Sequence, residues 1–206
     1  MFARSSTFKG EPSGLRDGIK YVQDEAMPML EEVEGFVGLS MMVDRGSGEC
    51  ITTTSWQTAD AMRASSDRIT GVRGRLGGLL MAPATVQEWE IAIMHRAEAT
   101  PAGKWCRATW VRTEENTTGL SIELYRTALL PRIQEFPGFC SASLLVDRAR
   151  DRVCTTSSFD SLETLQNSRD DAWMIREVGV SATGVDIMDA AEYELAIAHL
   201  RVPETV

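Results

Sequence analysis

The chain has 206 residues and a net charge of −9, and with 43% hydrophobic and 25% charged residues it has the composition of a globular protein. It contains no basic cluster and no apolar stretch near the roughly 20 residues of a membrane span, so nucleic acid and membrane are excluded as partners. The first residues lack an apolar signal core, and we expect a cytoplasmic protein.

The first expected element is a strand over about residues 2–8, and a helix follows it. The apolar residues of this helix recur at helical spacing and are Ile19, Val22, Ala26, Met29, Leu30 and Val33. Pro28 is expected to kink or end the helix, and Gly35 to release the chain into a second strand.

A hairpin, a second helix and a fourth strand complete this half of the chain. The turn residues of 44–48 are typical of a link between the second and third strands, and Thr58 is a good N-cap for the second helix. The fourth strand alternates, which places Trp89, Ile91 and Ile93 on one face and Glu88, Glu90 and Ala92 on the other. Residues 100–103 contain Pro101 and Gly103 and form the linker.

The second half repeats the first at a spacing of 103 residues. The run from Gly35 to Arg45 matches that from Gly138 to Arg148, and 11 of the 33 positions from 35 to 67 are identical without a gap. With a one-residue insertion, residues 88–93 match residues 192–197. The helix pattern recurs at Ile122, Tyr125, Leu129, Ile133 and Phe136, with Pro131 equivalent to Pro28, and with the N-cap at Ser161 and a strand over about residues 105–111.

Each half therefore has the order βαββαβ of a ferredoxin-like unit, residues 1–99 in the first copy and 104–206 in the second. Helices cover only one face of such a sheet, and the second copy is the simplest cover for the other face. The predicted fold is α+β, with two tandem ferredoxin-like repeats packed sheet to sheet as an intrachain pseudo-dimeric α+β barrel. A monomer is then sufficient, and a weak homodimer is the alternative.

The run from Met27 to Phe36, the stretch Thr52–Trp56 and the amphipathic helix after it resemble the dimeric α+β barrel superfamily. The nearest branch is the antibiotic-biosynthesis-monooxygenase-like domain, and the chain is also similar to actinobacterial proteins built from two repeats. The resemblance covers nearly the whole chain twice. It implies a fold more than an activity, because the superfamily includes cofactor-free oxygenases, haem degraders and isomerases.

The haem-degrading branch of this superfamily requires residues that this sequence lacks. It uses an Asn on the first strand, a Trp in the second helix and a His after that helix. The matching positions here hold Ser6 and Thr109, Ser65 and Ser168, and Gly74 and Glu177. We therefore expect no haem chemistry.

Four cysteines, Cys50, Cys106, Cys140 and Cys154, have neither C-x-x-C spacing nor nearby histidines. They are expected to be reduced, partly buried thiols. We predict no metal site and no cofactor.

His95 and His199, the only histidines, end the two fourth strands at equivalent positions. They are the candidate catalytic residues, because an imidazole facing an apolar pocket can serve as a general base. The structural alternative is a strand-end histidine bonded to a carbonyl or to solvent. Without an Asp or Cys partner, neither can form a triad or a metal site.

Two carboxylates per copy, Glu88 with Glu90 and Glu192 with Glu194, lie about 7 Å apart on one strand face. That spacing is compatible with paired acid–base chemistry. Arg4 and Arg107 are equivalent residues on the neighbouring first strands, however, and cross-strand Arg–Glu pairs are the preferred interpretation. The repeated Asp-Arg pairs at 44–45 and 147–148 are interpreted as turn-stabilising residues.

Aromatic residues supply the candidate ligand-binding positions, which are Trp56, Phe159, Trp89 and Trp110. Most aromatics at such positions belong to a core, although the corner near Trp56 can border a cleft between helices and sheet. The first strands differ between the copies, and this divergence allows one half to keep a pocket that the other has filled.

The sequence thus indicates a small-molecule-binding protein of the monooxygenase-like α+β barrel type, with a small hydrophobic or aromatic ligand. Its chemistry, if it is an enzyme, would be cofactor-independent oxidation or isomerisation of an aromatic or polyketide-like compound. The alternative is a non-catalytic, stress-associated or interaction scaffold.

Overall fold

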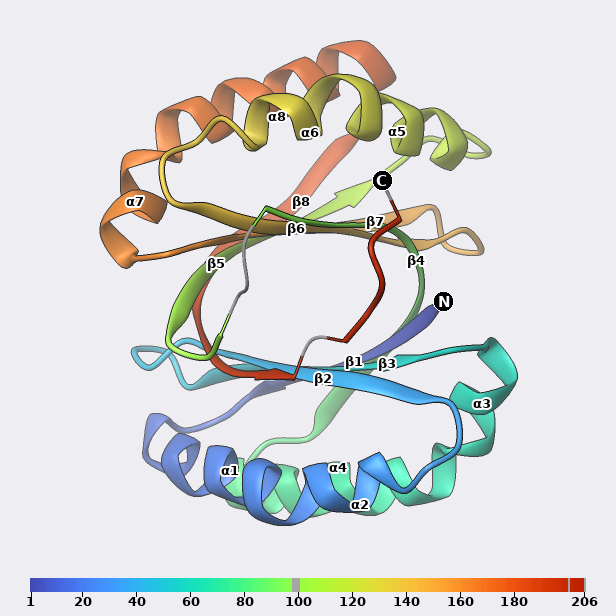
Figure 1. The fold of residues 1–206 in the computed structure, drawn as a ribbon, viewed down its shortest axis with the longest axis vertical. Helices are drawn as coiled ribbons and strands as arrows, with labels where there is room; N and C mark the ends of the chain where they lie inside the picture. The colour runs from blue at the N-terminus through green and yellow to red at the C-terminus, as the bar shows by residue number, and fades with distance from the viewer. Residues whose placement is uncertain (98–100, 200, 206) are drawn as a thin grey trace. The chain divides into compact units, whose positions relative to one another are not determined.

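The computed structural model describes residues 1–97, 101–199 and 201–205. Hydrogen bonding orders the strands β1-β3-β2-β8-β5-β7-β6-β4, which is the order of a closed antiparallel barrel (Figure 1). The α+β class, the tandem repeat and the barrel predicted from the sequence are confirmed. No helix in the described part of the chain is long and apolar enough to cross a membrane.

Two compact units make up the chain, and neither is a continuous piece of sequence. Unit 1 comprises Met1–Trp89, Pro101–Gly103 and Glu194–Val202, and unit 2 comprises Glu90–Thr100, Lys104–Tyr193 and Pro203–Val206. Strands β4 (Ala84–Arg96) and β8 (Asp186–His199) each begin in one unit and end in the other. The repeat boundaries, 1–99 and 104–206 with the linker 100–103, stay a prediction, since residues 98–100 lie outside the described residues.

Unit 1 contains a sheet in the order β1-β3-β2-β8, built from β1 (Phe2–Lys9), β2 (Phe36–Val43), β3 (Glu49–Trp56) and the end of β8. Its helical segments lie along one face of the sheet (Figure 1): η1 (Pro12–Gly14), α1 (Leu15–Tyr21), η2 (Val22–Ala26), α2 (Met27–Glu31), α3 (Ala59–Ala64) and α4 (Ser66–Leu80). The core between helices and sheet includes the fully buried Phe8, Leu76 and Leu80.

Unit 2 has the same plan, with the sheet order β5-β7-β6-β4. Its strands are β5 (Lys104–Arg112), β6 (Phe139–Asp147), β7 (Arg152–Phe159) and the end of β4. Its helical segments are α5 (Thr118–Leu124), η3 (Tyr125–Leu129), α6 (Leu130–Ile133), α7 (Leu162–Asn167) and α8 (Arg169–Thr183). Thr58 and Ser161 cap α3 and α7 as predicted, each accepting a hydrogen bond from the amide three residues on.

The first helical stretch of each unit contains one π-helical turn directly before its proline. The Met27 amide donates to the Val22 carbonyl, and the Leu130 amide donates to the Tyr125 carbonyl, both five residues back. Pro28 and Pro131 follow these turns, and a wide turn relieves the clash of a proline ring with the preceding turn. Gly35 and Gly138 have positive φ and directly precede β2 and β6, as predicted, but the helices already end at Glu31 and Ile133, so the prediction that these glycines end the helices is wrong.

A β-bulge near the end of β4 changes which residues share a face. Ile91 pairs with Leu145 and Ile93 with Leu144, and Ala92 is the extra residue. Because Leu144 and Leu145 point to opposite faces, Ile91 and Ile93 do so as well. The prediction that Trp89, Ile91 and Ile93 share one face is therefore wrong from Ile93 onward, and Ile93 joins the core under the helices of unit 2.

The four cysteines are free thiols, as the sequence predicts, and all of them are buried, whereas the sequence predicts partial burial. Burial raises the pKa of the Cys50, Cys106 and Cys154 thiols to about 12, so almost no thiolate exists at neutral pH. We expect the native protein to react with Ellman's reagent at pH 8 only as fast as it opens, and all four thiols to titrate within seconds in denaturant. Fast reaction of Cys50, Cys106 or Cys154 in the native state would contradict this burial.

Candidate functional site: the cavity of unit 2

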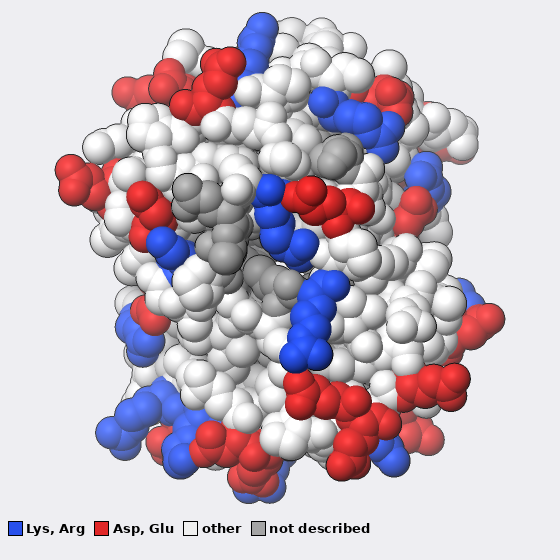
Figure 2. Space-filling model, viewed as in Figure 1, with Lys and Arg blue, Asp and Glu red and all other residues white. Residues whose placement is uncertain are grey.

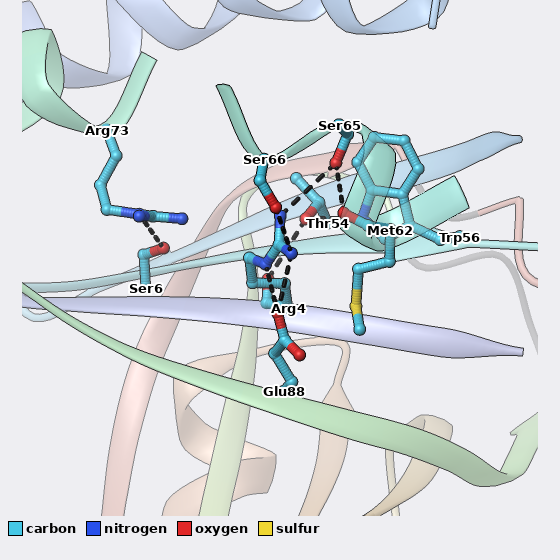
Figure 3. A network of polar contacts seen from close by, with 9 residues as sticks. All are labelled: Arg4, Ser6, Thr54, Trp56, Met62, Ser65, Ser66, Arg73 and Glu88. Atoms are coloured by element: carbon cyan, nitrogen blue, oxygen red, sulfur yellow. Dashed lines mark hydrogen bonds and ion pairs between the residues drawn. The ribbon is translucent and has the colours of Figure 1, made fainter. Parts of the chain in front are cut away.

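A buried arginine on the first strand organises the polar residues of unit 1 (Figure 3). Arg4 is 4% exposed, and its Nη2 lies 2.7 Å from Glu88 Oε1. The same guanidinium donates to the Ser65 and Ser66 hydroxyls at the junction between α3 and α4. The arginine therefore ties the first strand to the last strand and to the second helix.

Unit 2 repeats this arrangement around Arg107, which is 7% exposed. Arg107 donates to Glu192 Oε1 at 2.9 Å, to the Ser168 hydroxyl and to the Leu165 carbonyl. Arg169 donates to both oxygens of Glu192. Burial alone would raise the pKa of Glu192, but hydrogen bonds from Arg169 and Arg107 hold it below its ordinary value.

The other two glutamates pair with the hairpin arginines. Arg45 Nε lies 2.6 Å from Glu194, and Arg148 Nε lies 2.8 Å from Glu90. The preferred interpretation of the four carboxylates as ion-pair partners is confirmed, although Glu90 and Glu194 use the hairpin arginines instead of Arg4 and Arg107. Asp44 accepts from the Gly46 amide and stabilises its turn as predicted. Acidic and basic side chains are interspersed on the face that Figure 2 shows.

Unit 2 contains a cavity of about 110 Å³ between its sheet and its helices. Strands β5 and β7 form its floor, and η3 and α8 form most of its walls. Apolar side chains dominate the lining, among them Val111, Leu129, Ile133, Phe136, Leu144, Val153 and Ile175. The equivalent place in unit 1 holds a cavity of about 20 Å³, which is room for about one water molecule.

The difference in volume follows from a few exchanges between the repeats. Leu76 and Leu80 on α4, both fully buried, become Gly179 and Thr183 on α8. In the same way Phe8 becomes Val111, and Ile69 becomes Ala172. Val22 becomes the larger Tyr125, the one of these exchanges that adds volume. Side chains that fill the core of unit 1 are thus missing from unit 2.

Two polar groups at this cavity lack partners. Tyr125 is 4% exposed and lines the cavity, and its hydroxyl has no hydrogen-bond partner among the described residues. Burial raises its pKa, so the hydroxyl stays protonated at neutral pH. The buried Nε of Arg176 is likewise without a partner in the described part of the chain.

The repeat supplies an internal comparison for Arg176. Its equivalent in unit 1, Arg73, donates from Nε to the Ser6 hydroxyl at 3.2 Å (Figure 3). Thr109 replaces Ser6 in unit 2 and forms no such bond with Arg176. One copy thus satisfies this donor internally, and the other leaves it at an open cavity.

Neither histidine lies at the two cavities. His95 stacks on Phe139 with ring centroids 6.2 Å apart, and its Nδ1 is 3.9 Å from Glu204. His199 stacks on Phe36 at 6.3 Å, and its Nε2 is 3.5 Å from Glu31. Both nitrogens of His199 are buried without a hydrogen bond among the described residues. A catalytic role of the histidines stays a prediction.

The candidate aromatic residues also lie outside the lining of both cavities. Trp56 is fully buried and donates to the Thr54 hydroxyl, and Trp89 donates to the Ser5 hydroxyl. Phe159 lies under the Arg107 guanidinium, 5.8 Å from it. Trp110 packs edge-on against Tyr193. Their role in ligand binding stays a prediction, and the contacts they make are those of core residues.

Sequence reasoning missed Tyr125, Arg176 and Gly179 as site residues. The sequence predicts Tyr125 only as a residue on the apolar face of its helix and indicates no role for Gly179 or Arg176. The signal lay in comparing equivalent core positions of the repeats, where Leu76 aligns with Gly179. A large-to-small exchange inside an amphipathic helix marks a place that is no longer filled.

Comparison with known proteins gives two kinds of similarity, and no family model matches the chain. The uncharacterised protein Rv2558 of Mycobacterium tuberculosis is 44% identical over 207 residues, covering 100% of this chain and 88% of the relative. The uncharacterised protein Rv2557 of the same organism is 41% identical over 206 residues, covering 100% and 92%.

Solved structures share the fold at low sequence identity. A candidate monooxygenase of Lactobacillus acidophilus has a TM-score of 0.68 and 8% identity, covering 94% of this chain and 92% of that one. An anthrone oxidase-like protein has a TM-score of 0.66 and 13% identity, covering 96% and 91%. A ferredoxin-fold protein of Listeria monocytogenes related to antibiotic biosynthesis monooxygenases has a TM-score of 0.53 and 10% identity, covering 94% of each chain. The chain therefore belongs to one family with the mycobacterial proteins Rv2557 and Rv2558, and its fold is that of the monooxygenase-like α+β barrels.

Proposed function

We propose that the protein binds a small, mostly apolar molecule in the cavity of unit 2. The observation that carries this proposal is the contrast between equivalent places, about 110 Å³ in unit 2 against about 20 Å³ in unit 1. An engineered apolar cavity of roughly 150 Å³ binds benzene, so the cavity of unit 2 suits a molecule with one ring. Binding is then confined to one of the two units.

The lining has the character of a ligand site more than of a packing defect. Ligand sites are mostly apolar with a few polar groups that fix orientation. Tyr125 and Arg176 are such groups, and both are buried without a partner in the described part of the chain. An unpaired hydroxyl in a core lowers the stability of the folded protein. A ligand that supplies the missing hydrogen bond would offset this cost.

For the chemistry, we propose cofactor-independent oxidation or isomerisation of an aromatic or polyketide-like compound. The fold shared with a protein named as anthrone oxidase-like supports this class. Within the cavity, the Tyr125 hydroxyl is the group suited to donating a hydrogen bond to a bound oxygen atom that gains negative charge during the reaction. The rival function, a non-catalytic interaction or stress-associated scaffold, needs neither an open cavity nor an unpaired hydroxyl.

Binding can be tested by titrating the isotopically labelled protein with indole and following backbone amide shifts. We expect saturable shifts at Val111, Ile175 and Gly179 and none at the equivalent Phe8, Val72 and Leu76. The repeat thus provides the control within one molecule. Absence of shifts with indole, which has two fused rings, and with one-ring compounds such as benzene would reject the proposal and favour the scaffold. Oxygen uptake and product analysis with compounds that bind would separate turnover from binding alone.

A further inference from the structure

The charged residues that line the cavity of unit 2 restrict the class of ligand that it can bind. This inference rests on the proposed function, since it concerns the same cavity. Two arginines, Arg107 and Arg176, line the cavity, and the lining contains no Asp or Glu. The whole chain carries a net charge of −9, so a cationic lining does not follow from composition.

The two arginines differ in how their charge is balanced. Arg107 is bound to Glu192, which Arg169 also contacts. Arg176 forms no ion pair among the described residues, and its buried Nε–H has no hydrogen-bond partner there. Burial lowers the pKa of Arg176 and the positive charge of Arg107 lowers it further, whereas the negative charges of Glu192 and Glu177 raise it. A negative charge placed beside Arg176 would offset both its burial and its repulsion by Arg107.

Tyr125 adds a second donor to the same space. Its hydroxyl is protonated and unpartnered, and its ring is buried in the π-helical turn opposite α8. A neutral apolar molecule would leave both donors unsatisfied. An oxyanion would accept a charge-assisted hydrogen bond from each of them.

We propose that unit 2 binds a small organic acid as its anion, with an apolar one-ring body against Val111, Val153 and Ile175 and a carboxylate facing Arg176 and Tyr125. In unit 1 the equivalent Arg73 already donates to Ser6, and Val22 replaces the tyrosine. Unit 1 lacks the space and both unused donors. It therefore does not bind such a ligand.

Benzoate and benzamide are matched probes for this proposal, because they share shape and ring and differ in charge. Affinities are measured by titration calorimetry or by amide shifts on the intact chain. We expect benzoate to bind at least about tenfold more tightly than benzamide. Equal affinity would overturn the anion proposal and leave the proposed function standing, whereas no binding of either probe, nor of indole, would reject the proposed function itself.

Arg176→Gln and Arg73→Gln form a matched pair of variants. We expect Arg176→Gln to weaken benzoate by about tenfold, to leave benzamide nearly unchanged, and so to remove the preference. Arg73→Gln should leave both affinities as in the wild type, because that residue lies in unit 1. An equal effect of the two variants on benzoate would overturn the proposal.

Tyr125→Phe keeps the test decisive if Arg176→Gln does not fold. It removes only an unpaired buried hydroxyl, so folding is expected to be preserved. Benzoate should bind about fivefold more weakly, since one of two hydrogen bonds to the carboxylate is lost. A variant that keeps the full wild-type affinity for benzoate would show that the carboxylate does not lie at this end of the cavity.

Discussion

Replacement of Gly179 by leucine is expected to stabilise the protein and abolish ligand binding at the same time. The change restores in unit 2 the residue that unit 1 has at position 76. A Cβ at Gly179 would meet Leu129 Cδ1 at 3.7 Å, an ordinary van der Waals contact, so the helix can accept a side chain. The leucine side chain would then occupy the cavity.

The expected gain in folding stability of Gly179→Leu has two sources. Glycine in a helix interior is about 1 kcal/mol less favourable than leucine or alanine, and burying a leucine adds roughly 1.5–3 kcal/mol before any strain. We expect a net gain of about 2 kcal/mol, which for a chain of this length raises Tm by about 4–8 °C. Binding of indole or benzoate should fall below detection.

Gly74→Ala is the control for helix propensity. Gly74 lies on α4 of unit 1, has open space around its Cβ and lines neither cavity. The substitution should therefore stabilise the protein by up to about 1 kcal/mol and leave binding intact. Calorimetric melting and probe titration of both variants give the result. Wild-type binding by Gly179→Leu would show that the ligand site lies elsewhere, and a large loss of stability would show that the cavity cannot hold the side chain.

The second large effect concerns Glu192. Glu192→Ala would leave the Arg107 guanidinium buried without its counter-ion, and the side chains of this pair are only 8% and 20% exposed. Breaking such a pair typically costs about 3–5 kcal/mol, and we expect about 3 kcal/mol because Ser168 and Leu165 still accept from Arg107. Urea unfolding measures the change.

Glu88→Ala in unit 1 is the matched comparison. Arg4 donates to Glu88 from Nε and Nη2, but the glutamate side chain is 44% exposed, so water can take its place. We expect a loss of about 1 kcal/mol. Equal losses in the two variants would mean that burial does not set the strength of these pairs.

The loss of folding stability caused by Glu192→Ala should also depend on pH. The folded-state pKa of Glu192 is below its unfolded value, so its contribution is fully present above the unfolded pKa of about 4.5. It is lost as pH falls through the lower folded pKa. The stabilities of wild type and Glu192→Ala should therefore converge in acid, and a difference that persists unchanged at pH 3 would contradict this linkage.

Much of the fold could be predicted because its signals are local and occur twice. Gly35 and Gly138 mark the same strand start, Thr58 and Ser161 the same cap, and Arg4 and Arg107 the same cross-strand pair. Each of these signals in one copy recurs at the equivalent position of the other. The βαββαβ order followed from these repeated signals.

What the sequence did not reveal depends on three-dimensional packing. The bulge at Ala92 reverses the phase of β4, and no residue type at that position signals it. The cavity results from several exchanges on three different elements, and only their position in space shows that Leu76, Leu80 and Phe8 fill one volume. Unsatisfied donors such as the Tyr125 hydroxyl become visible only when every neighbour has been placed.

The passage of β4 and β8 from one unit into the other has a consequence for how the chain melts. Unfolding of the sheet in either unit also unfolds part of a strand that continues into the other unit. Heating or denaturant should therefore remove both units in one transition, and a ligand held by unit 2 alone would protect amides in unit 1 from hydrogen exchange through global opening.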